Sequence, residues 1–179
     1  MKLEDVYTQV VGLVPLYTDE GNATRIICWS DDGDMISLTD TRQVEGIKRL
    51  LARNYALDLS AQAAQLHKNY HRSPPLPFHL PDGRIFVPFK LRLARIAGDA
   101  CYGYIELKII DRIVPGEKNR CRLFLTNGQT LPVYSQITTA RLALFFGLEI
   151  QKANKRKPDP DQDLMFAFHI LRRYLTVKQ

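Results

Sequence analysis

The chain has 179 residues, of which 45% are hydrophobic and 25% are charged, and its formal net charge is +6. This length and balance predict one compact globular domain, or one domain with a short appendage. No run approaches the roughly 18 uninterrupted apolar residues that a membrane-spanning helix needs, and the first residues lack the pattern of a secretory signal. We therefore expect a cytoplasmic protein without membrane contact.

The positive charge is concentrated in the second part of the sequence. Residues 1–65 carry 6 Lys/Arg against 10 Asp/Glu, a net of −4, whereas residues 66–179 carry 19 against 9, a net of +10. Such an asymmetry suggests that the second part forms a surface for a polyanion such as nucleic acid. A soluble basic protein without such a partner is the alternative.

The three cysteines, Cys28, Cys101 and Cys121, are an odd number at wide spacing, each among apolar or aromatic neighbours. This pattern predicts reduced thiols that act as small hydrophobic side chains rather than a disulfide framework or a paired-cysteine zinc site. A reducing cytosol fits this expectation.

The first elements are predicted to be two hairpins followed by a helix. VVGLVPLY and RIICW are strand candidates on either side of the polar turn TDEGN, and Asp32-Gly33 favours a tight turn before the strand MISL. Over residues 41–54, apolar residues recur at helical spacing behind Asp40 or Thr41 as the cap. The apolar positions of this helix are Val44, Ile47, Leu50 and Leu51.

A second helix is predicted over residues 58–70, and the prolines of RSPPLP prevent its continuation. After the Asp82-Gly83 turn, RIFVPFKLRLARI is predicted to form one strand, with Pro88 at an edge or a bulge. On such a strand Lys90 and Arg92 share one face while leucines occupy the other, so Arg92 is predicted to point into solvent.

The next stretch, ACYGYIELKIIDRIV, is predicted to be a single strand, followed by the turn PGEKN. RCRLFLTNGQTLPVYS then forms a hairpin around Asn127-Gly128, and TTARLALFFGL forms a short apolar helix. Aligning Gly33 with Gly128 matches apolar positions in both segments, which predicts two copies of one hairpin-plus-helix unit. Independent origin of two such units is the alternative.

The last residues are predicted to form an appendage to a domain that spans residues 1–150. QKANKRKPDP is a basic linker, and DQDLMFAFHILRRYLTVK is an amphipathic helix whose apolar stripe must pack on the body or on a second subunit. The fold class is thus α+β, with antiparallel hairpins packed against helices and an amphipathic helix at the end. The stripe consists of Leu164, Phe168, Leu171 and Leu175.

Basic residues on or beside the hairpins are the candidates for nucleic-acid contact, because DNA grooves accept two-stranded ribbons. The alternative is a solvated sheet face on which basic residues prevent edge-to-edge association. The hairpin candidates are Arg84, Lys90, Arg92, Arg95, Arg120 and Arg122, and the linker adds Lys155, Arg156 and Lys157 as backbone contacts.

Two patterns are weighed as enzyme or metal sites. Pro81-Asp82 followed by Glu106-Leu107-Lys108 matches the PD-(D/E)xK spelling of metal-dependent nucleases, although a turn and polar alternation explain the same letters. His67 and His71 have the spacing of a helical metal pair, but the sequence supplies no third ligand in a known motif. We expect no catalytic activity, no metal and no other cofactor, with the nuclease kept as an alternative function.

Several stretches, in the same order, resemble the competence transcription factor (ComK) family. LVPLYTDEGNATRI is similar to its N-terminal strand pair, HRSPPLPF to its Lys-Pro-Pro stretch, GRIFVPF to its aromatic segment, and LFLTNGQTLPVYS to its Asn-Gly hairpin before a helix. Cys101-Tyr102 is similar to the family's Cys followed by an aromatic residue. The section around residues 100–150 also resembles the end of LytTR-type DNA-binding domains.

These resemblances imply a bacterial activator of competence genes that binds A·T-rich promoter boxes in double-stranded DNA as a homo-oligomer, with a proteolytic adaptor as a further partner. Minor-groove contact would favour arginines in a narrow groove. The family's Thr and Ser after its Phe-Pro pair have no counterpart after Phe89. A DNA-binding transcription regulator is the predicted function, and a protein-interaction module is the remaining alternative.

Overall fold

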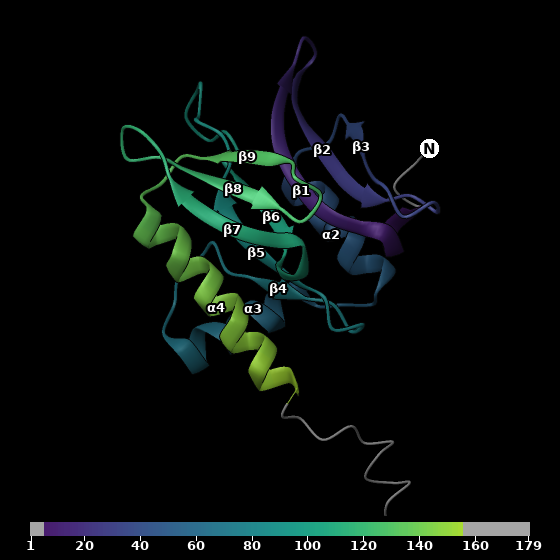
Figure 1. Cartoon of the computed structure of the whole chain (residues 1–179). Coiled ribbons are helices and arrows are strands. Elements are labelled where there is room, and N and C mark those ends of the chain that lie inside the picture. Colours follow the sequence, from purple (N-terminus) through teal and green to yellow (C-terminus); the bar gives the residue numbers. More distant parts are fainter. Residues whose placement is uncertain (1–5, 156–179) are drawn as a thin grey trace, which may run out of the picture.

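In the computed structural model, which describes residues 6–155, the strands form two antiparallel sheets, and three α-helices pack against them (Figure 1). The six-stranded sheet has the order β3-β2-β1-β6-β5-β4, and the three-stranded sheet has the order β7-β8-β9. The predicted α+β class is therefore confirmed. The strands are β1 (Val10–Thr18), β2 (Gly21–Trp29), β3 (Met35–Asp40), β4 (Phe78–His79), β5 (Ile85–Lys90), β6 (Tyr102–Glu106), β7 (Ile110–Pro115), β8 (Cys121–Leu125) and β9 (Thr130–Val133).

The central strands β1, β6 and β5 of the six-stranded sheet are buried on both faces, and neighbouring residues of the sheet enter different cores. Phe86 belongs to a core with α2 (Val44–Asn54), while Val87 belongs to a core with α4 (Ile137–Lys155) and the three-stranded sheet. Ile26 and Ile27 divide between the two cores in the same way. Because both faces are covered, these strands are continuous apolar runs rather than alternating ones.

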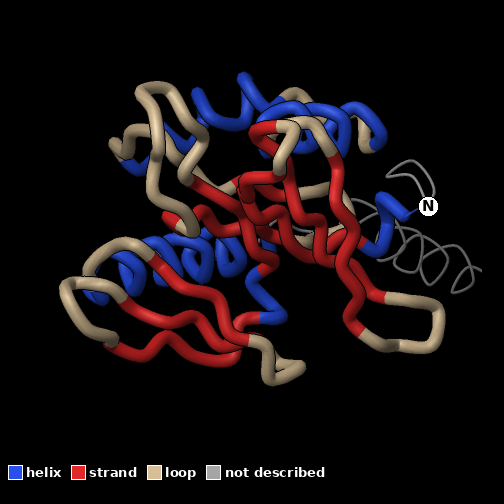
Figure 2. The backbone as a smooth tube through the Cα atoms, turned by 90° about the horizontal axis from the view of Figure 1, so that it is seen from above, coloured by secondary structure: helices blue, strands red, loops and turns tan. Residues whose placement is uncertain are grey.

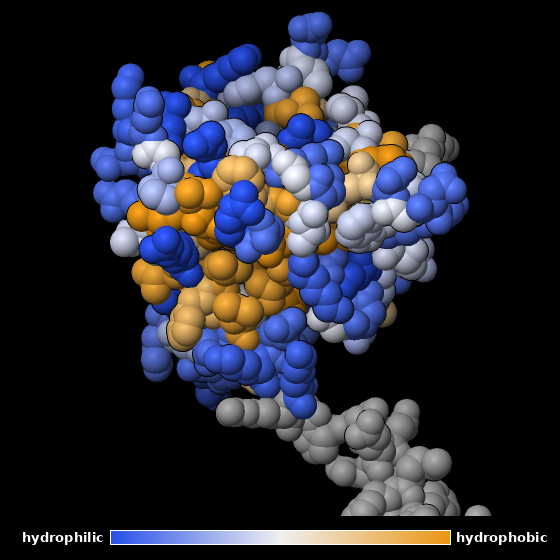
Figure 3. Space-filling view, in the orientation of Figure 1, coloured by the Kyte–Doolittle hydropathy of each residue, from blue (hydrophilic) through white to orange (hydrophobic). Residues whose placement is uncertain are grey.

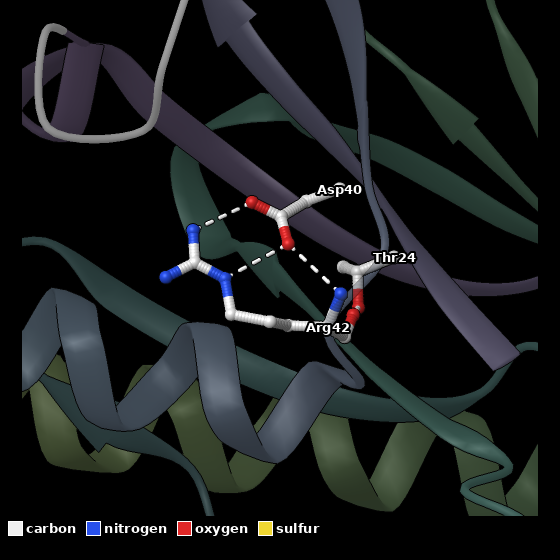
Figure 4. A network of polar contacts seen from close by, with 3 residues as sticks. All are labelled: Thr24, Asp40 and Arg42. Atoms are coloured by element: carbon white, nitrogen blue, oxygen red, sulfur yellow. Dashed lines mark hydrogen bonds and ion pairs between the residues drawn. The ribbon is translucent and has the colours of Figure 1, made fainter.

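The first helix begins later than the sequence predicts. Gln43 is its N-cap residue and makes no side-chain capping bond, so the prediction of Asp40 or Thr41 as the cap is wrong. Asp40 instead accepts hydrogen bonds from the backbone and guanidinium of Arg42, and Thr24 donates to the Arg42 carbonyl at 2.7 Å (Figure 4). The hydrogen bond from Arg42 lowers the pKa of Asp40. This network attaches the β3–α2 connection to the middle of β2.

The predicted second helix is confirmed as α3 (Leu59–Tyr70). The Asp58 side chain accepts hydrogen bonds from the backbone N–H groups of Ser60 and Ala61, as an N-cap residue does. The helix ends at His71, which has a left-handed conformation with φ of 52°.

The predicted strand over residues 84–96 is confirmed only as far as Lys90. Beyond it, the N–H groups of Leu91 and Arg92 both bond to the carbonyl of Cys101, which closes a loop. In that loop Arg92 is 7% exposed and Leu93 is 47% exposed. The expected alternation, with Arg92 in solvent and Leu93 buried, is therefore wrong. Pro88 does lie on an edge, because β4 pairs only with Ile85 and Phe86.

The single strand predicted over residues 100–114 is two strands in different sheets. The 3-10 helix η2 (Leu107–Ile109) separates β6 from β7 and carries the chain from the six-stranded to the three-stranded sheet. The hairpin around Asn127-Gly128 is confirmed, with Gly128 at φ of 83°. The helix that follows continues to Lys155, past the predicted start of the linker at residue 151.

Helix α4 lies between the three-stranded sheet and the rest of the molecule (Figure 2). Its contacts reach β5 on one side and β7 on the other. At the closest approach to β5, a Cβ added to Gly147 would lie 2.6 Å from a methyl group of Val87, so the helix needs glycine there. The inner face of the small sheet is consequently covered, and nothing within residues 6–155 covers its outer face.

Both proposed repeat units contain a hairpin and then a helix, but their helices are buried differently. Ile47 of α2 is fully buried, whereas its aligned counterpart Leu142 of α4 is 49% exposed. The predicted amphipathic helix after residue 160 lies outside the described residues. No helix of the described part of the chain is long and apolar enough to cross a membrane.

Candidate nucleic-acid interface

The outer face of the three-stranded sheet presents a row of exposed arginines. Arg112 of β7 is opposite Phe124 of β8, and Arg122 of β8 is opposite Val114 and Pro132. Arg120 continues the same face two residues before Arg122, because side chains of a strand alternate between faces. All three arginines are exposed.

The aromatic rings of this face hold two of the three guanidinium groups. Arg112 lies over the ring of Phe124, 4.3 Å from its centre, and Arg120 lies 5.0 Å from the ring centre of Tyr134. Cation–π contact of this kind restricts a long side chain without removing its charge from solvent. The sheet therefore presents arginines that are partly oriented before any ligand binds.

The charge of this region is positive. Residues 110–134 contain four Lys/Arg, at positions 112, 118, 120 and 122, and two Asp/Glu, at positions 111 and 117, a net of +2. Asp111 forms an ion pair with its neighbour Arg112. Arg120 and Arg122 form no ion pair within residues 6–155. These two residues thus offer free positive charge on the open face.

The opposite face of the same sheet fixes the backbone beneath these arginines. Its side chains alternate with the exposed ones and are buried against Ala140, Phe146 and Ile150 of α4. The buried residues are Ile113, Cys121, Leu123, Leu125, Leu131 and Val133. A packed inner face and a charged outer face together make a rigid platform for ligand contact.

Arg84 is one of the predicted contact residues that the structure places elsewhere. Its guanidinium forms an ion pair with Asp82 at 2.8 Å, donates to the carbonyl of Val10 at 2.6 Å, and donates to the hydroxyl of Tyr55. The side chain is only 11% exposed. Arg84 therefore joins the β4–β5 turn to β1 and has no free donor face for a phosphate.

Arg92 and Arg95 lie in the loop after β5 and contact β1. The Arg92 guanidinium donates to the carbonyl of Leu16 at 2.7 Å and packs 3.9 Å from the ring centre of Tyr17. Arg95 packs on the same ring at 4.0 Å and stays exposed. Asp99 accepts hydrogen bonds from Tyr17, Asn22 and the loop backbone, and these bonds hold its pKa well below the usual range.

Two further predicted residues, Lys90 and Lys155, do not join the sheet surface. Lys90 is half-buried and lines a cavity on the other side of β5, and Lys155 is exposed at the end of α4. Arg156 and Lys157 lie outside the described residues. Of the seven predicted contacts within residues 6–155, the open sheet face thus contains Arg120 and Arg122.

The nuclease alternative finds no support in the geometry. Asp82 is engaged by Arg84 through the guanidinium and the backbone N–H. Glu106 is almost fully buried at the end of β6, and burial raises its pKa despite the opposing charges of Arg84 and Lys108. Two carboxylates in these settings do not form an open metal site. No group of three or more metal-ligating side chains is found within residues 6–155.

The histidines and cysteines have structural settings. His67 forms a ring hydrogen bond with the carbonyl of Arg72, and His71 lies beyond the end of α3, so the two do not share a helical face. Cys28 and Cys121 are buried free thiols, as predicted, and burial raises the pKa of each. Cys101 is also a free thiol but is only half-buried.

Arg112 is not among the contact residues predicted from the sequence, although it lies on the same face as Arg120 and Arg122. The signal was available in the turn PGEKN, because pairing the strands on either side of that turn places Arg112 opposite Phe124. Because residues 100–114 are predicted to form one continuous strand, the separate strand β7 and its pairing with β8 are not recognised from the sequence.

Comparisons with protein-family models, with curated proteins and with solved structures find no match to this chain. The function must therefore be argued from its own residues, and the ComK and LytTR resemblances stay predictions.

Proposed function

We propose that this protein is a DNA-binding transcription regulator of the bacterial cytoplasm that docks the outer face of β7–β8–β9 against duplex DNA. The observation that carries the proposal is the row of Arg112, Arg120 and Arg122 on a sheet whose other face is packed on α4. Strands lie about 4.8 Å apart, so the two-stranded β7–β8 ribbon that carries Arg112 and Arg122 is narrower than about 10 Å between its strand axes. That width suits a major groove about 12 Å across.

The proposed contact surface differs from the one that the sequence predicts. Arg84 and Arg92 are occupied by internal acceptors, so the contacts to bases fall to Arg120 and Arg122. The ComK resemblance implies A·T-rich promoter boxes and adaptor-guided proteolysis, and both belong to this proposal. A flat arginine-bearing sheet favours the major groove over the minor-groove contact that the same resemblance suggests.

The first prediction concerns DNA affinity, measured by fluorescence anisotropy with A·T-rich and random duplexes at several salt concentrations. We expect the logarithm of affinity to fall with the logarithm of salt, with a slope of about −0.9 for each phosphate contact. Arg122→Ala should weaken binding to the preferred duplex by about 1 to 3 kcal/mol more than binding to random DNA if it contacts a base.

The matched control is Arg49→Ala, which removes an exposed arginine from α2 on the far side of the six-stranded sheet. This variant should bind DNA as the unaltered protein does. Equal losses for Arg49→Ala and Arg122→Ala, or a flat salt dependence, would contradict the sheet as the contact surface. If the protein instead binds single-stranded DNA more tightly, the ligand would be unpaired bases that stack on Phe124 and Tyr134.

One observation favours the homo-oligomer that the resemblance implies. Leu142, Phe145 and Leu148 form an exposed apolar stripe on α4, and Figure 3 shows hydrophobic side chains gathered over this helix. Phe145 is 56% exposed. Exposed apolar patches of this kind mark association surfaces, and a second copy of the chain is the occupant that we propose.

The second prediction follows from that stripe. Phe145→Ser should lower the mass observed in sedimentation equilibrium while the melting temperature of the protomer is retained, because the side chain supports no buried core. Thr138→Ser, an exposed change on the same helix, is the control and should leave the mass unaltered. A monomeric unaltered protein, or an oligomer insensitive to Phe145→Ser, would refute this use of α4.

A further inference from the structure

A cavity of about 670 Å³ lies on the side of the six-stranded sheet away from the proposed DNA surface. It is lined by helices α2 and α3, the proline segment of residues 74–77, and the β5–β6 region. Its volume falls within the range of about 300 to 1,000 Å³ that is usual for small-molecule sites. The proposed DNA contact uses none of the side chains that line it.

One wall of the cavity carries a lysine in an aromatic setting. Lys48 of α2 has a side chain only 13% exposed, and its amine lies 4.4 Å from the ring centre of Tyr104 and 5.5 Å from that of Phe78. It donates to the Tyr104 hydroxyl at 3.0 Å and pairs with the exposed Glu45 at 3.3 Å. The amine is thus held at the cavity wall by groups on two sides.

The Tyr104 hydroxyl has a proton to offer to a ligand. It accepts a hydrogen bond from Lys48, and its own proton has no acceptor within residues 6–155. Burial raises the pKa of Tyr104, although the charge of Lys48 opposes the shift, so the phenol remains neutral at physiological pH. Tyr104 lines the cavity, and a buried donor without an acceptor favours a ligand that supplies one.

A second lysine adds a positive charge to the cavity wall. Lys90 lines the cavity at the end of β5 and forms no ion pair within the described residues. The two carboxylates that line the cavity are already engaged, since Glu45 pairs with Lys48 and Asp99 accepts four hydrogen bonds from other groups. The lining residues carry two positive and two negative charges, but Lys90 has no carboxylate partner among the described residues, so an anionic group would bind beside Lys90.

The other walls are apolar and partly flat. Leu59, Ala63 and Leu76 line the cavity together with the prolines and the rings of Phe78 and Tyr102. Such surfaces bind a planar or branched hydrocarbon body, while the few polar groups fix its orientation.

We propose that this cavity binds a small amphipathic organic anion, an aromatic carboxylate or aryl phosphate, with its anionic group between Lys48, Lys90 and Tyr104 and its apolar body against the α3 and proline walls. The site is defined by its own residues and does not depend on the proposed DNA-binding function. A protein that binds no DNA would still contain it.

Titration of the full chain with anilinonaphthalene sulfonate, a fluorescent aromatic anion, tests the proposal. Saturable binding with enhanced fluorescence is expected, and benzoate should displace the dye while benzamide, its neutral analogue, should not. Lys90→Met should weaken dye binding by about tenfold, as expected for the loss of one charge-assisted contact. Ala63→Phe, which fills the cavity from α3, should weaken it at least as much.

Two controls separate this cavity from other surfaces that attract the dye. Lys152→Met removes a lysine from α4, and Phe145→Ser reduces the exposed apolar stripe of that helix; neither should change the affinity. Circular dichroism confirms folding of each variant, and Lys90→Met decides alone if Ala63→Phe does not fold. The proposal is overturned if binding is not saturable, if benzamide competes as well as benzoate, or if Lys90→Met binds like the unaltered chain.

Discussion

Arginines lie on or beside predicted hairpins in both the six-stranded and the three-stranded sheet regions. In the folded molecule, however, the two groups have different surroundings. Arg84 and Arg92 donate to the carbonyls of Val10 and Leu16, at the two ends of β1. Arg120 and Arg122 face solvent on a sheet whose three strands are already paired with one another. The two pairs of arginines differ because the fold brings backbone carbonyl acceptors within hydrogen-bonding distance of Arg84 and Arg92.

This comparison shows which basic residues maintain the fold and which are free to bind a ligand. In the large sheet region, loops and turns pack beside the sheet and lie close to buried backbone carbonyl groups. These carbonyl groups need hydrogen-bond donors. In the small sheet, α4 covers one face and nothing described covers the other. A charged side chain on the open face keeps its hydration, and it can exchange that hydration for contact with phosphate.

The largest expected effect that tests the comparison is on stability. Arg84→Ala should lower the free energy of unfolding by about 2 to 3 kcal/mol, because it leaves Asp82 without its ion-pair partner and the Val10 carbonyl without a donor. Arg122→Ala should change it by no more than about 0.5 kcal/mol, as is usual for an exposed side chain. Urea unfolding of both variants measures the difference, and equal losses would show that the two regions do not differ in this way.

A smaller effect is expected from the pH dependence of stability. Burial raises the pKa of Glu106, so the folded state retains a proton that the unfolded state has already released. The contribution of protonated Glu106 to the free energy of unfolding is fully present below the pKa of the unfolded state. It is lost as the pH rises through the pKa of the folded state. Glu106→Gln should therefore raise the melting temperature at pH 7 and have little effect near pH 3.

Glu117→Gln is the control for this prediction, because Glu117 is exposed in the turn between β7 and β8. Its melting temperature should equal that of the unaltered protein at both pH values. The contrary result is a Glu106→Gln variant that melts below the unaltered protein at pH 7 but not at pH 3. It would mean that neighbouring groups stabilise the charged carboxylate.

Local patterns in the sequence were sufficient to predict most of the secondary structure. Asp32-Gly33, Asp82-Gly83 and Asn127-Gly128 each place a glycine at positive φ, where other residues are strained, so these turns depend on only a few neighbouring residues. The helical spacing of apolar residues likewise predicted α2 and α3, and the proline segment after residue 72 predicted where α3 ends. These features follow from backbone sterics and periodicity, which act over short distances in the chain.

The direction of the charged side chains was decided only by the tertiary structure. Period-two alternation predicted an exposed Arg92, but the strand ends at Lys90, and Arg92 finds a carbonyl of β1 and the ring of Tyr17, both more than 70 residues earlier in the chain. The break at Leu107–Ile109 likewise transfers the chain between sheets within an unbroken apolar run. Such choices depend on which distant acceptors and apolar surfaces become available on folding, because a buried guanidinium must have partners wherever the fold supplies them.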